Sequence, residues 1–404
     1  MLQDRLPGCL TADPCARAET PPNMSLTSSN VLPHSPFTLH PMKIAQIAPL
    51  AESVPPRLYG GTERVVSNLT EELVRQGHQV TLFASGDSQT AAELVACTDV
   101  ALRLNPAVRD HLPYHLMMID QVRRRAAEFD VIHFHIDMLP FPLIRDFADR
   151  TVTTLHGRLD LPDLLPFYRA FPEIPLVSIS DHQRLPMPPV NWVGCVHHGV
   201  PTRFLPFSAT PKGGDKGGDK GGYLAFLGRI SPEKRPDRAI EIAVRAGMPL
   251  KMAAKIDAVD RAYWDSTIAP LVERHANVEY IGEINEQQKG EFLGNASALL
   301  FPIDWPEPFG LVMIEAMACG TPVIAFHAAS VPEVIEPGRS GFIVHNIGEA
   351  VEAVARLPEL DRSVVRACFD KRFSVERMAR DYLAIYRALP GVQTPEPPLL
   401  RVAA

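Results

Sequence analysis

The chain has few of the features that mark membrane-spanning, metal-binding or dinucleotide-binding proteins. Its longest apolar run, around 296–302, has the length of a strand and is too short to cross a bilayer. The six cysteines are scattered without the spacing of metal ligands, which is typical of reduced thiols in a cytoplasmic protein. No Gly-x-Gly-x-x-Gly occurs, so a nicotinamide site has little support.

The charge balance excludes further classes of function. The 404 residues carry 40 Lys and Arg against 47 Asp and Glu, which gives a net charge of -7. This balance argues against a nucleic-acid partner and against a strongly basic membrane patch, and it is compatible with peripheral contact with a membrane surface. A chain of this length is expected to form two domains rather than one core.

Residues 1–41 differ from the rest of the chain because they are rich in Pro, Ser and Thr and lack apolar periodicity. They contain no basic segment followed by an apolar one, so we expect no signal peptide. We expect a disordered or upstream extension here, and a folded part that begins at Met42.

From Met42 onward, short apolar segments alternate with amphipathic ones. Strands alternating with helices imply an α/β fold with parallel sheets, and a second strand–loop–helix pattern restarts at Tyr223. Two facing Rossmann-like domains would leave a cleft at the carboxyl ends of their strands, where ligands bind. The predicted strands are 43–48, 80–84, 131–134, 151–155, 176–179, 223–227, 250–254, 278–281, 298–301 and 323–325, and the predicted helices include 63–76, 237–246 and 375–388.

The composition also suggests where the domains end. The Lys/Gly/Asp-rich repeat before Tyr223 is typical of a flexible, solvated linker. We therefore predict an N-terminal domain at 42–205, a linker at 206–222, a C-terminal domain at 223–374, a closing helix at 375–389 and a tail at 390–404.

The segment from Trp305 to Ile324 carries the strongest chemical pattern. A loop with one carboxylate, Glu307, leads into a short helix with a second, Glu315. The free N–H groups and dipole of a helix N-terminus suit a phosphate, and carboxylates accept hydrogen bonds from vicinal hydroxyls. Both could be ordinary helix acids, but the apolar neighbours of Glu315 disfavour that reading. Together the two features suit a sugar nucleotide.

Two cations lie on the predicted loop after the strand at 223–227. Arg229 and Lys234 could clamp a diphosphate and neutralise it as a leaving group. In isolation the pattern fits a solvated basic loop equally well. Because the acidic segment is expected at the same sheet edge, the clamp is the favoured interpretation.

The N-terminal half offers weaker signals. Gly60 and Gly61 permit a turn and the close approach of a phosphate, although most glycine pairs mark only a turn. His156 ends a predicted strand and could hydrogen-bond a substrate hydroxyl or present its own carbonyl. His133 and His135 share one face of a strand, but no third ligand is evident, so a structural role is favoured over a metal site.

Together these residues resemble the retaining glycosyltransferases of the GT-B fold, specifically glycosyltransferase family 4. The resemblance covers about 42–389. Its most specific part runs from Glu307 to Glu315 and on through Gly-Thr-Pro-Val. Arg229 with Lys234 is the second matching element, and the glycine pair and His156 support both.

The resemblance implies transfer of a hexose from a nucleotide-diphosphate sugar to an acceptor hydroxyl, with retention of anomeric configuration and without metal or cofactor. UDP-glucose is the donor expected from family frequency, and the acceptor stays open between a glycan, a lipid-linked sugar and a small metabolite. The implied roles are diphosphate binding by Arg229 and Lys234, a sugar contact by Glu307, a ribose contact by Glu315, donor contacts by Gly60, Gly61 and the amides of Phe309, Gly310 and Leu311, and a place beside the sugar for His156.

One departure and two alternatives accompany this prediction. Ala253, Ala254 and Lys255 stand where many relatives have a glycine-rich turn, so we expect Lys255 to project toward the nucleotide. A GT-B sugar-nucleotide epimerase would keep a similar cleft, and epimerisation without any acceptor would support it. A non-catalytic sugar-nucleotide-binding protein is disfavoured by the complete set of charged residues.

Overall fold

The computed structural model describes residues 40–57, 60–211 and 222–392. All elements below belong to the compact unit formed by residues 41–404. The predictions for 1–39, for the glycine-rich repeat at 212–221 and for 393–404 lie outside the described residues. The strands are β1 Lys43–Ile47, β2 Gln79–Ser85, β3 Glu93–Thr98, β4 Val131–Phe134, β5 Thr151–Thr154, β6 Leu176–Ser178, β7 Trp192–Cys195, β8 Leu224–Arg229, β9 Leu250–Lys255, β10 Val278–Gly282, β11 Ala298–Phe301, β12 Val323–Phe326 and β13 Gly341–Val344.

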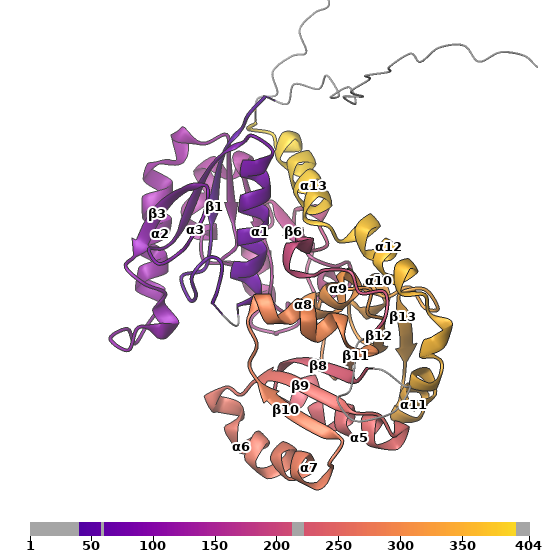
Figure 1. Cartoon of the computed structure of the whole chain (residues 1–404). Coiled ribbons are helices and arrows are strands. Elements are labelled where there is room, and N and C mark those ends of the chain that lie inside the picture. Colours follow the sequence, from indigo (N-terminus) through magenta and orange to yellow (C-terminus); the bar gives the residue numbers. More distant parts are fainter. Residues whose placement is uncertain (1–39, 58–59, 212–221, 393–404) are drawn as a thin grey trace, which may run out of the picture. The chain divides into compact units, whose positions relative to one another are not determined.

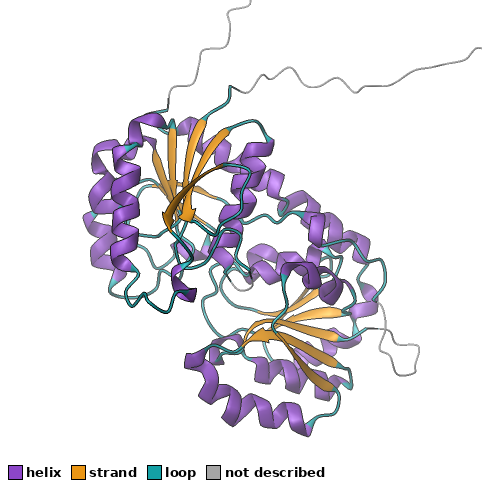
Figure 2. Cartoon of the chain, turned by 60° about the vertical axis from the view of Figure 1, so that its left-hand side comes forward, coloured by secondary structure: helices purple, strands orange, loops and turns teal. Residues whose placement is uncertain are grey.

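Helices connect these strands and cover the sheets, as Figure 2 shows by colour. Within the described residues, no helix combines the length and the apolarity that crossing a bilayer requires. The α-helices are α1 Gly61–Arg75, α2 Leu112–Arg124, α3 Phe141–Ile144, α4 Leu164–Ala170, α5 Pro236–Ala246, α6 Arg261–Tyr263, α7 Ala269–Arg274, α8 Glu286–Gly294, α9 Leu311–Ala318, α10 Val331–Val334, α11 Ile347–Ala355, α12 Arg362–Arg372 and α13 Val375–Ala388.

Two parallel sheets organise the described part of the chain (Figure 1). The first has seven strands in the order β3-β2-β1-β4-β5-β6-β7, and the second has six in the order β10-β9-β8-β11-β12-β13. The strand order reverses between β1 and β4 and again between β8 and β11, which is the doubly wound Rossmann topology in duplicate. The predicted α/β fold with two Rossmann-like domains is confirmed. We call the first sheet with its helices the N-terminal lobe and the second the C-terminal lobe.

Three strands that the sequence did not reveal, β3, β7 and β13, lie at sheet edges. Side chains along β3 and β7 are half-buried or exposed, so neither strand forms the continuous buried apolar run that marks a central strand. The strands that were predicted are mostly buried, except for the edge strand β10, which has half-buried and exposed residues. The observed ends of the predicted strands differ from the expected ones by at most two residues.

Two predicted loops are shorter than expected. Helix α1 begins at Gly61 rather than Glu63, so one residue of the glycine pair belongs to the first helical turn. Strand β8 extends to Arg229, because Gly228 and Arg229 still pair with Ala254 and Lys255 of β9. Arg229 is therefore fixed by the sheet ladder rather than carried on a loop.

The closing helix α13 packs on the N-terminal lobe although it comes last in the chain. Ser374 caps it, since its Oγ accepts a hydrogen bond from the Arg377 N–H at 3.2 Å. Met378 and Tyr382 belong to the same buried cluster as Val65 of α1, and Figure 1 shows α13 beside α1. The predicted helix at 375–388 is thus present, and it completes the core of the first lobe.

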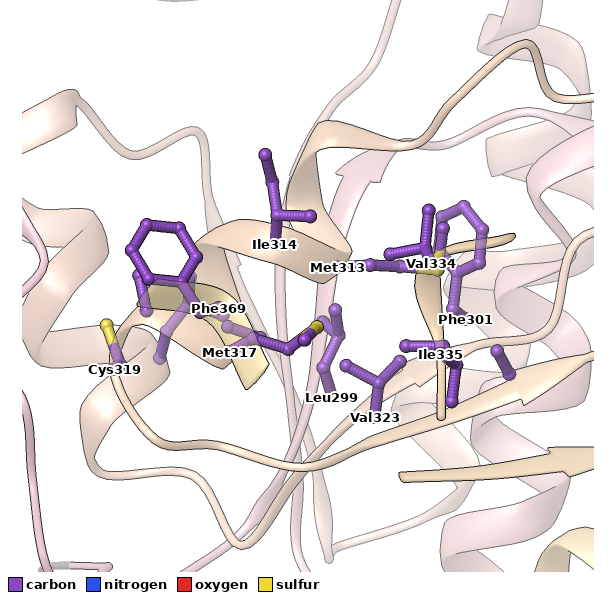
Figure 3. Close-up of a cluster of buried hydrophobic side chains, with 14 of the residues drawn as sticks. Leu299, Phe301, Met313, Ile314, Met317, Cys319, Val323, Val334, Ile335 and Phe369 are labelled. Atoms are coloured by element: carbon purple, nitrogen blue, oxygen red, sulfur yellow. The ribbon is translucent and has the colours of Figure 1, made fainter. Parts of the chain in front are cut away.

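Helix α9, which carries Glu315, rests on a dense apolar cluster in the C-terminal lobe (Figure 3). Met313 and Met317 pack against Leu299, Val323 and neighbouring side chains, all of them buried. Burial of each such side chain contributes about 1.5–3 kcal/mol. A site at the start of α9 therefore stands on a rigid support.

Candidate functional site

A cavity of about 510 Å³ has walls from both lobes. One wall comes from the start of α1 and from the segments after β1 and β5, and the other from the segments after β8 and β11 together with α9. Of these strands, β1, β8 and β11 border the points where the strand order reverses, the usual ligand position in such sheets. All ten residues that the sequence assigned to the site line this cavity: Gly60, Gly61, His156, Arg229, Lys234, Glu307, Phe309, Gly310, Leu311 and Glu315.

Two helices begin at the cavity, and each has a glycine as its N-cap. Gly60 precedes α1 with φ 147°, Gly310 precedes α9 with φ 88°, and neither helix start has a side-chain cap. A Cβ on Gly310 would lie 2.8 Å from Cε of Met313, and one on Gly61 would lie 3.7 Å from Cδ1 of Leu311. The two helix starts are therefore neighbours, and their N–H groups suit one shared anion.

Lys234 and Glu307 form an ion pair at the cavity wall, where both side chains are largely buried. Trp305 supports this pair in two ways. Its Nε1–H donates to Oε2 of Glu307 at 2.8 Å, and its ring lies 4.6 Å from Nζ of Lys234. The carboxylate is thus oriented by two donors, while the ammonium group has three N–H groups and keeps some for a ligand.

Arg229 is held by acids of its own lobe. Its Nη2 lies 2.6 Å from Oε1 of Glu233, and its Nη1 lies 3.7 Å from Asp257. The Nε of Arg229 is buried and has no hydrogen-bond partner among the described residues. Lys255 also lines the cavity and lies 2.8 Å from Asp257. An incoming anion would exchange with these carboxylates rather than meet bare cations.

Glu315 is 1% exposed, and only one of its two carboxylate oxygens has a hydrogen-bond partner among the described residues. Its Oε1 lies 2.6 Å from Nζ of Lys289, whereas its Oε2 is buried without a hydrogen-bond partner in the described part of the chain. Lys289 also lies 3.2 Å from Glu286, which forms an ion pair with Arg64 of α1. The Glu315 carboxylate is therefore part of a charged network that reaches the other lobe.

Histidines form part of the wall of the N-terminal lobe. His156 lines the cavity, and its ring stacks on that of His198 at 5.4 Å and 15°. His135 lies behind it, with Nδ1 2.9 Å from Nε2 of His156. Burial lowers the pKa of His156 to about 3 and holds those of His135 and His198 well below the usual histidine value. These three histidine rings are uncharged at neutral pH.

Two protein-family models match the chain in succession. The model described as Glycosyltransferase Family 4 matches residues 59–183, and the model described as Glycosyl transferases group 1 matches residues 215–366. The first match covers most of the N-terminal lobe and the second most of the C-terminal lobe. The chain belongs to the family 4 glycosyltransferases.

Known relatives of this glycosyltransferase agree with that assignment. The alpha-maltose-1-phosphate synthase of Mycolicibacterium smegmatis is 30% identical over 184 residues, which are 41% of this chain and 47% of that protein. Sucrose-phosphate synthase from Thermosynechococcus elongatus has a TM-score of 0.68 at 18% identity, over 86% of this chain and 99% of that one. The Anabaena protein HepE, in complex with UDP and glucose, has a TM-score of 0.65 at 18% identity, over 86% and 100%.

The structural and the sequence comparisons support different conclusions. The structural likenesses show that the glycosyltransferase has the GT-B fold. The sequence match spans about half the length of the curated relative, so it supports the family rather than a particular substrate.

Several cavity residues were not predicted from the sequence, among them Lys289 and His198. Lys289 stands in a helix with no motif around it, and nothing local links it to Glu315, its partner 26 positions away. His198 was interpreted as part of a loop toward the linker, but it is buried and lines the cavity. A His-His-Gly sequence directly after a strand is the one signal that could have pointed to it. His133 and His135 pack against each other in the core, and no group of three or more metal-ligating side chains occurs in the described ranges.

Proposed function

We propose that this glycosyltransferase moves a hexose from a nucleotide-diphosphate sugar to an acceptor hydroxyl, with retention of anomeric configuration and without a metal ion. One observation carries most of the support. A single cavity is lined by two helix N-termini without a side-chain cap, by the cations Arg229 and Lys234, and by the acids Glu307 and Glu315. Amides and cations suit a diphosphate, and carboxylates suit sugar hydroxyls.

In this proposal each charged side chain contacts a particular part of the donor. Arg229 and Lys234 clamp the diphosphate, Glu307 accepts hydrogen bonds from the hexose, and the free oxygen of Glu315 accepts from the ribose. The bond from the anomeric carbon to the diphosphate oxygen breaks while the bond to the acceptor oxygen forms on the same face. The acceptor proton passes to the departing diphosphate. The clamp stabilises the charge that develops there, so it lowers the barrier rather than only binding the donor.

UDP-glucose is the donor that we propose first. HepE, a neighbour in fold, is known in complex with UDP and glucose, and the charged cavity of this chain has groups for the hexose, the diphosphate and the ribose of such a donor. The relatives bear the names of glycosyl-transferring enzymes, which favours transfer over the epimerase or non-catalytic alternatives. The described cysteines are free thiols, and on that basis we propose a cytoplasmic location.

A panel of nucleotide sugars that vary in base and in sugar tests this proposal. A donor present at 100 times its dissociation constant should stabilise the protein by about 2.7 kcal/mol in thermal unfolding. Product analysis by NMR then reads the anomeric configuration, with and without EDTA. Glu307→Gln should abolish most transfer, while Glu279→Gln, on an exposed part of β10, is the matched control. Epimerised donor without acceptor product would instead support the alternative, and no stabilisation by any donor would contradict the proposal.

A further inference from the structure

A buried chain of hydrogen bonds leads from the closing helix to His156. The Nε2 of Gln46 in β1 lies 3.2 Å from the hydroxyl of Tyr386 in α13, and Oε1 of Gln46 lies 2.8 Å from Nε2 of His135. Nδ1 of His135 in turn lies 2.9 Å from Nε2 of His156. Gln46 and Tyr386 are 0% exposed and His135 is 2% exposed. Of the four residues, His156 is the one that lines the cavity.

We propose that this series of hydrogen bonds fixes the tautomer of His156, so that the ring offers an unprotonated Nδ1 to the cavity as an acceptor for a hydroxyl of the donor sugar. Gln46, His135 and Tyr386 are then positioning residues that do not touch the substrate. The identity of the ligand rests on the proposed function, whereas the tautomer itself does not depend on it.

Gln46 determines which atom donates and which accepts in each of these hydrogen bonds. A carboxamide oxygen only accepts hydrogen bonds and its nitrogen only donates them. Because the oxygen faces His135, Nε2 of His135 must carry a proton. A neutral imidazole has one N–H, so Nδ1 of His135 accepts, and Nε2 of His156 must donate to it. The proton of His156 is therefore on Nε2, and Nδ1 is left unprotonated.

The surroundings of His156 fit this role. A single tautomer exists only in a neutral ring, and burial keeps both His135 and His156 neutral at physiological pH by lowering their pKa values. Stacking on His198 holds the plane of the His156 ring. Nδ1 of His156 makes no hydrogen bond with any of the described residues, so it is available to a ligand in the cavity.

A side branch of the same network leads away from the cavity. The hydroxyl of Tyr386 lies 2.7 Å from Nδ1 of His133, whose Nε2 lies 2.7 Å from Oγ1 of Thr154. Thr154 in turn lies 3.0 Å from the hydroxyl of Tyr382. Since Gln46 donates to Tyr386, the phenolic proton can point at His133. The branch is therefore compatible with the donors and acceptors assigned above. It does not include His156, which makes it a matched control.

Nitrogen-15 NMR of histidine-labelled protein reads the tautomer without any ligand, and the His156 signals are identified by their loss in His156→Gln. In the unaltered protein we expect a proton on Nε2 of His156 and none on Nδ1. Gln46→Met removes the acceptor for His135, so the His156 tautomers should mix and transfer should fall about tenfold, the effect of one hydrogen bond. Thr154→Val, equally buried, cuts only the side branch and should change neither readout.

A second pair of variants distinguishes the proposed role of His135 from a folding defect. In His135→Asn, the amide oxygen can still accept from Nε2 of His156, so the tautomer and most of the transfer should be retained, whereas His135→Leu should lose both. A proton on Nδ1 of His156 in the unaltered protein overturns the proposal. So does a folded Gln46→Met protein with an unchanged tautomer, or with a mixed tautomer and full transfer. Failure of every nucleotide sugar to bind would refute the proposed function and leave the NMR result intact.

Discussion

The two walls of the cavity differ in their electrostatics. The wall of the C-terminal lobe consists of charges that are already paired, Lys234 with Glu307 and Lys289 with Glu315. The wall of the N-terminal lobe also has the charged residues Glu63, Arg64, Arg103 and Arg158, but its histidine rings around His156 and the glycines at the start of α1 are uncharged, and we call this part the neutral wall. A ligand on the charged wall must exchange or share partners with these charges, apart from atoms such as Oε2 of Glu315 that have no partner among the described residues. The neutral wall has no charge to exchange and selects a ligand by the direction of its hydrogen bonds.

Pairing on the charged wall has a physical reason. A carboxylate or ammonium group that is largely buried without a partner costs several kcal/mol. The pairs therefore stabilise the cavity wall, and each retains unused capacity for a ligand, such as the second oxygen of Glu315. Ligand affinity on this wall is then the difference between two sets of charged contacts, so single substitutions there should have large effects.

The largest effect is expected at Lys234. Lys234→Ala removes a preorganised cation from the diphosphate and should lower the rate of transfer by at least ~100-fold at saturating donor. It also leaves Glu307 without its ionic partner. Steady-state kinetics with the donor found in the panel measure the change. Lys251→Ala, which removes a half-exposed lysine of β9 outside the cavity, is the control and should leave the rate unchanged. Equal rates for both variants would show that the clamp contributes nothing to the transition state.

A smaller and more selective effect is expected at Glu315. Glu315→Gln keeps the shape of the side chain but weakens its hydrogen bonds to ribose hydroxyls, so UDP affinity should fall about tenfold. Pyrophosphate carries no ribose, and its affinity should stay the same. Calorimetric titration with both ligands separates the two parts of the charged wall. If pyrophosphate binding weakened as much as UDP binding, Glu315 would belong to the phosphate site instead.

The charged wall could be predicted from the sequence because its residues are close along the chain. Glu307 and Glu315 stand on one loop and the helix that follows, and Arg229 and Lys234 flank one short turn. Local spacing therefore places each pair at the same edge of a sheet. The partners supplied by other elements, such as Lys289, were not predictable, because only tertiary packing brings α8 against α9.

The neutral wall was predictable only at Gly60, Gly61 and His156. Gln46 and Tyr386 are 340 positions apart, and they meet because β1 pairs with β4, β4 pairs with β5, and the last helix returns to the first lobe. Strand order and the return of α13 are properties of the whole topology. A single sequence shows the histidines as alternating residues of a strand and gives no sign of what they contact.

Acidification should distinguish the neutral wall by its effect on stability. Burial lowers the pKa of His156 to about 3 in the folded protein, whereas an unfolded chain has a histidine pKa of about 6.5. Above pH 6.5 the residue is neutral in both states and has no effect. As the pH falls toward 3, the unfolded state takes up a proton that the folded state does not. The free energy of unfolding should therefore decrease, by up to about 1.4 kcal/mol per pH unit for each such histidine.

Urea unfolding at pH 7.5, 6.5 and 5.5 measures this slope. His156→Gln removes one of the protons taken up on unfolding, so its stability should fall less steeply below pH 6.5 than that of the unaltered protein. His345→Gln, at an exposed position, should keep the original slope. Equal slopes for His156→Gln and the unaltered protein would mean that His156 already binds its proton in the folded state. In that case its ring would be a donor on both nitrogens, and the neutral wall would carry a charge after all.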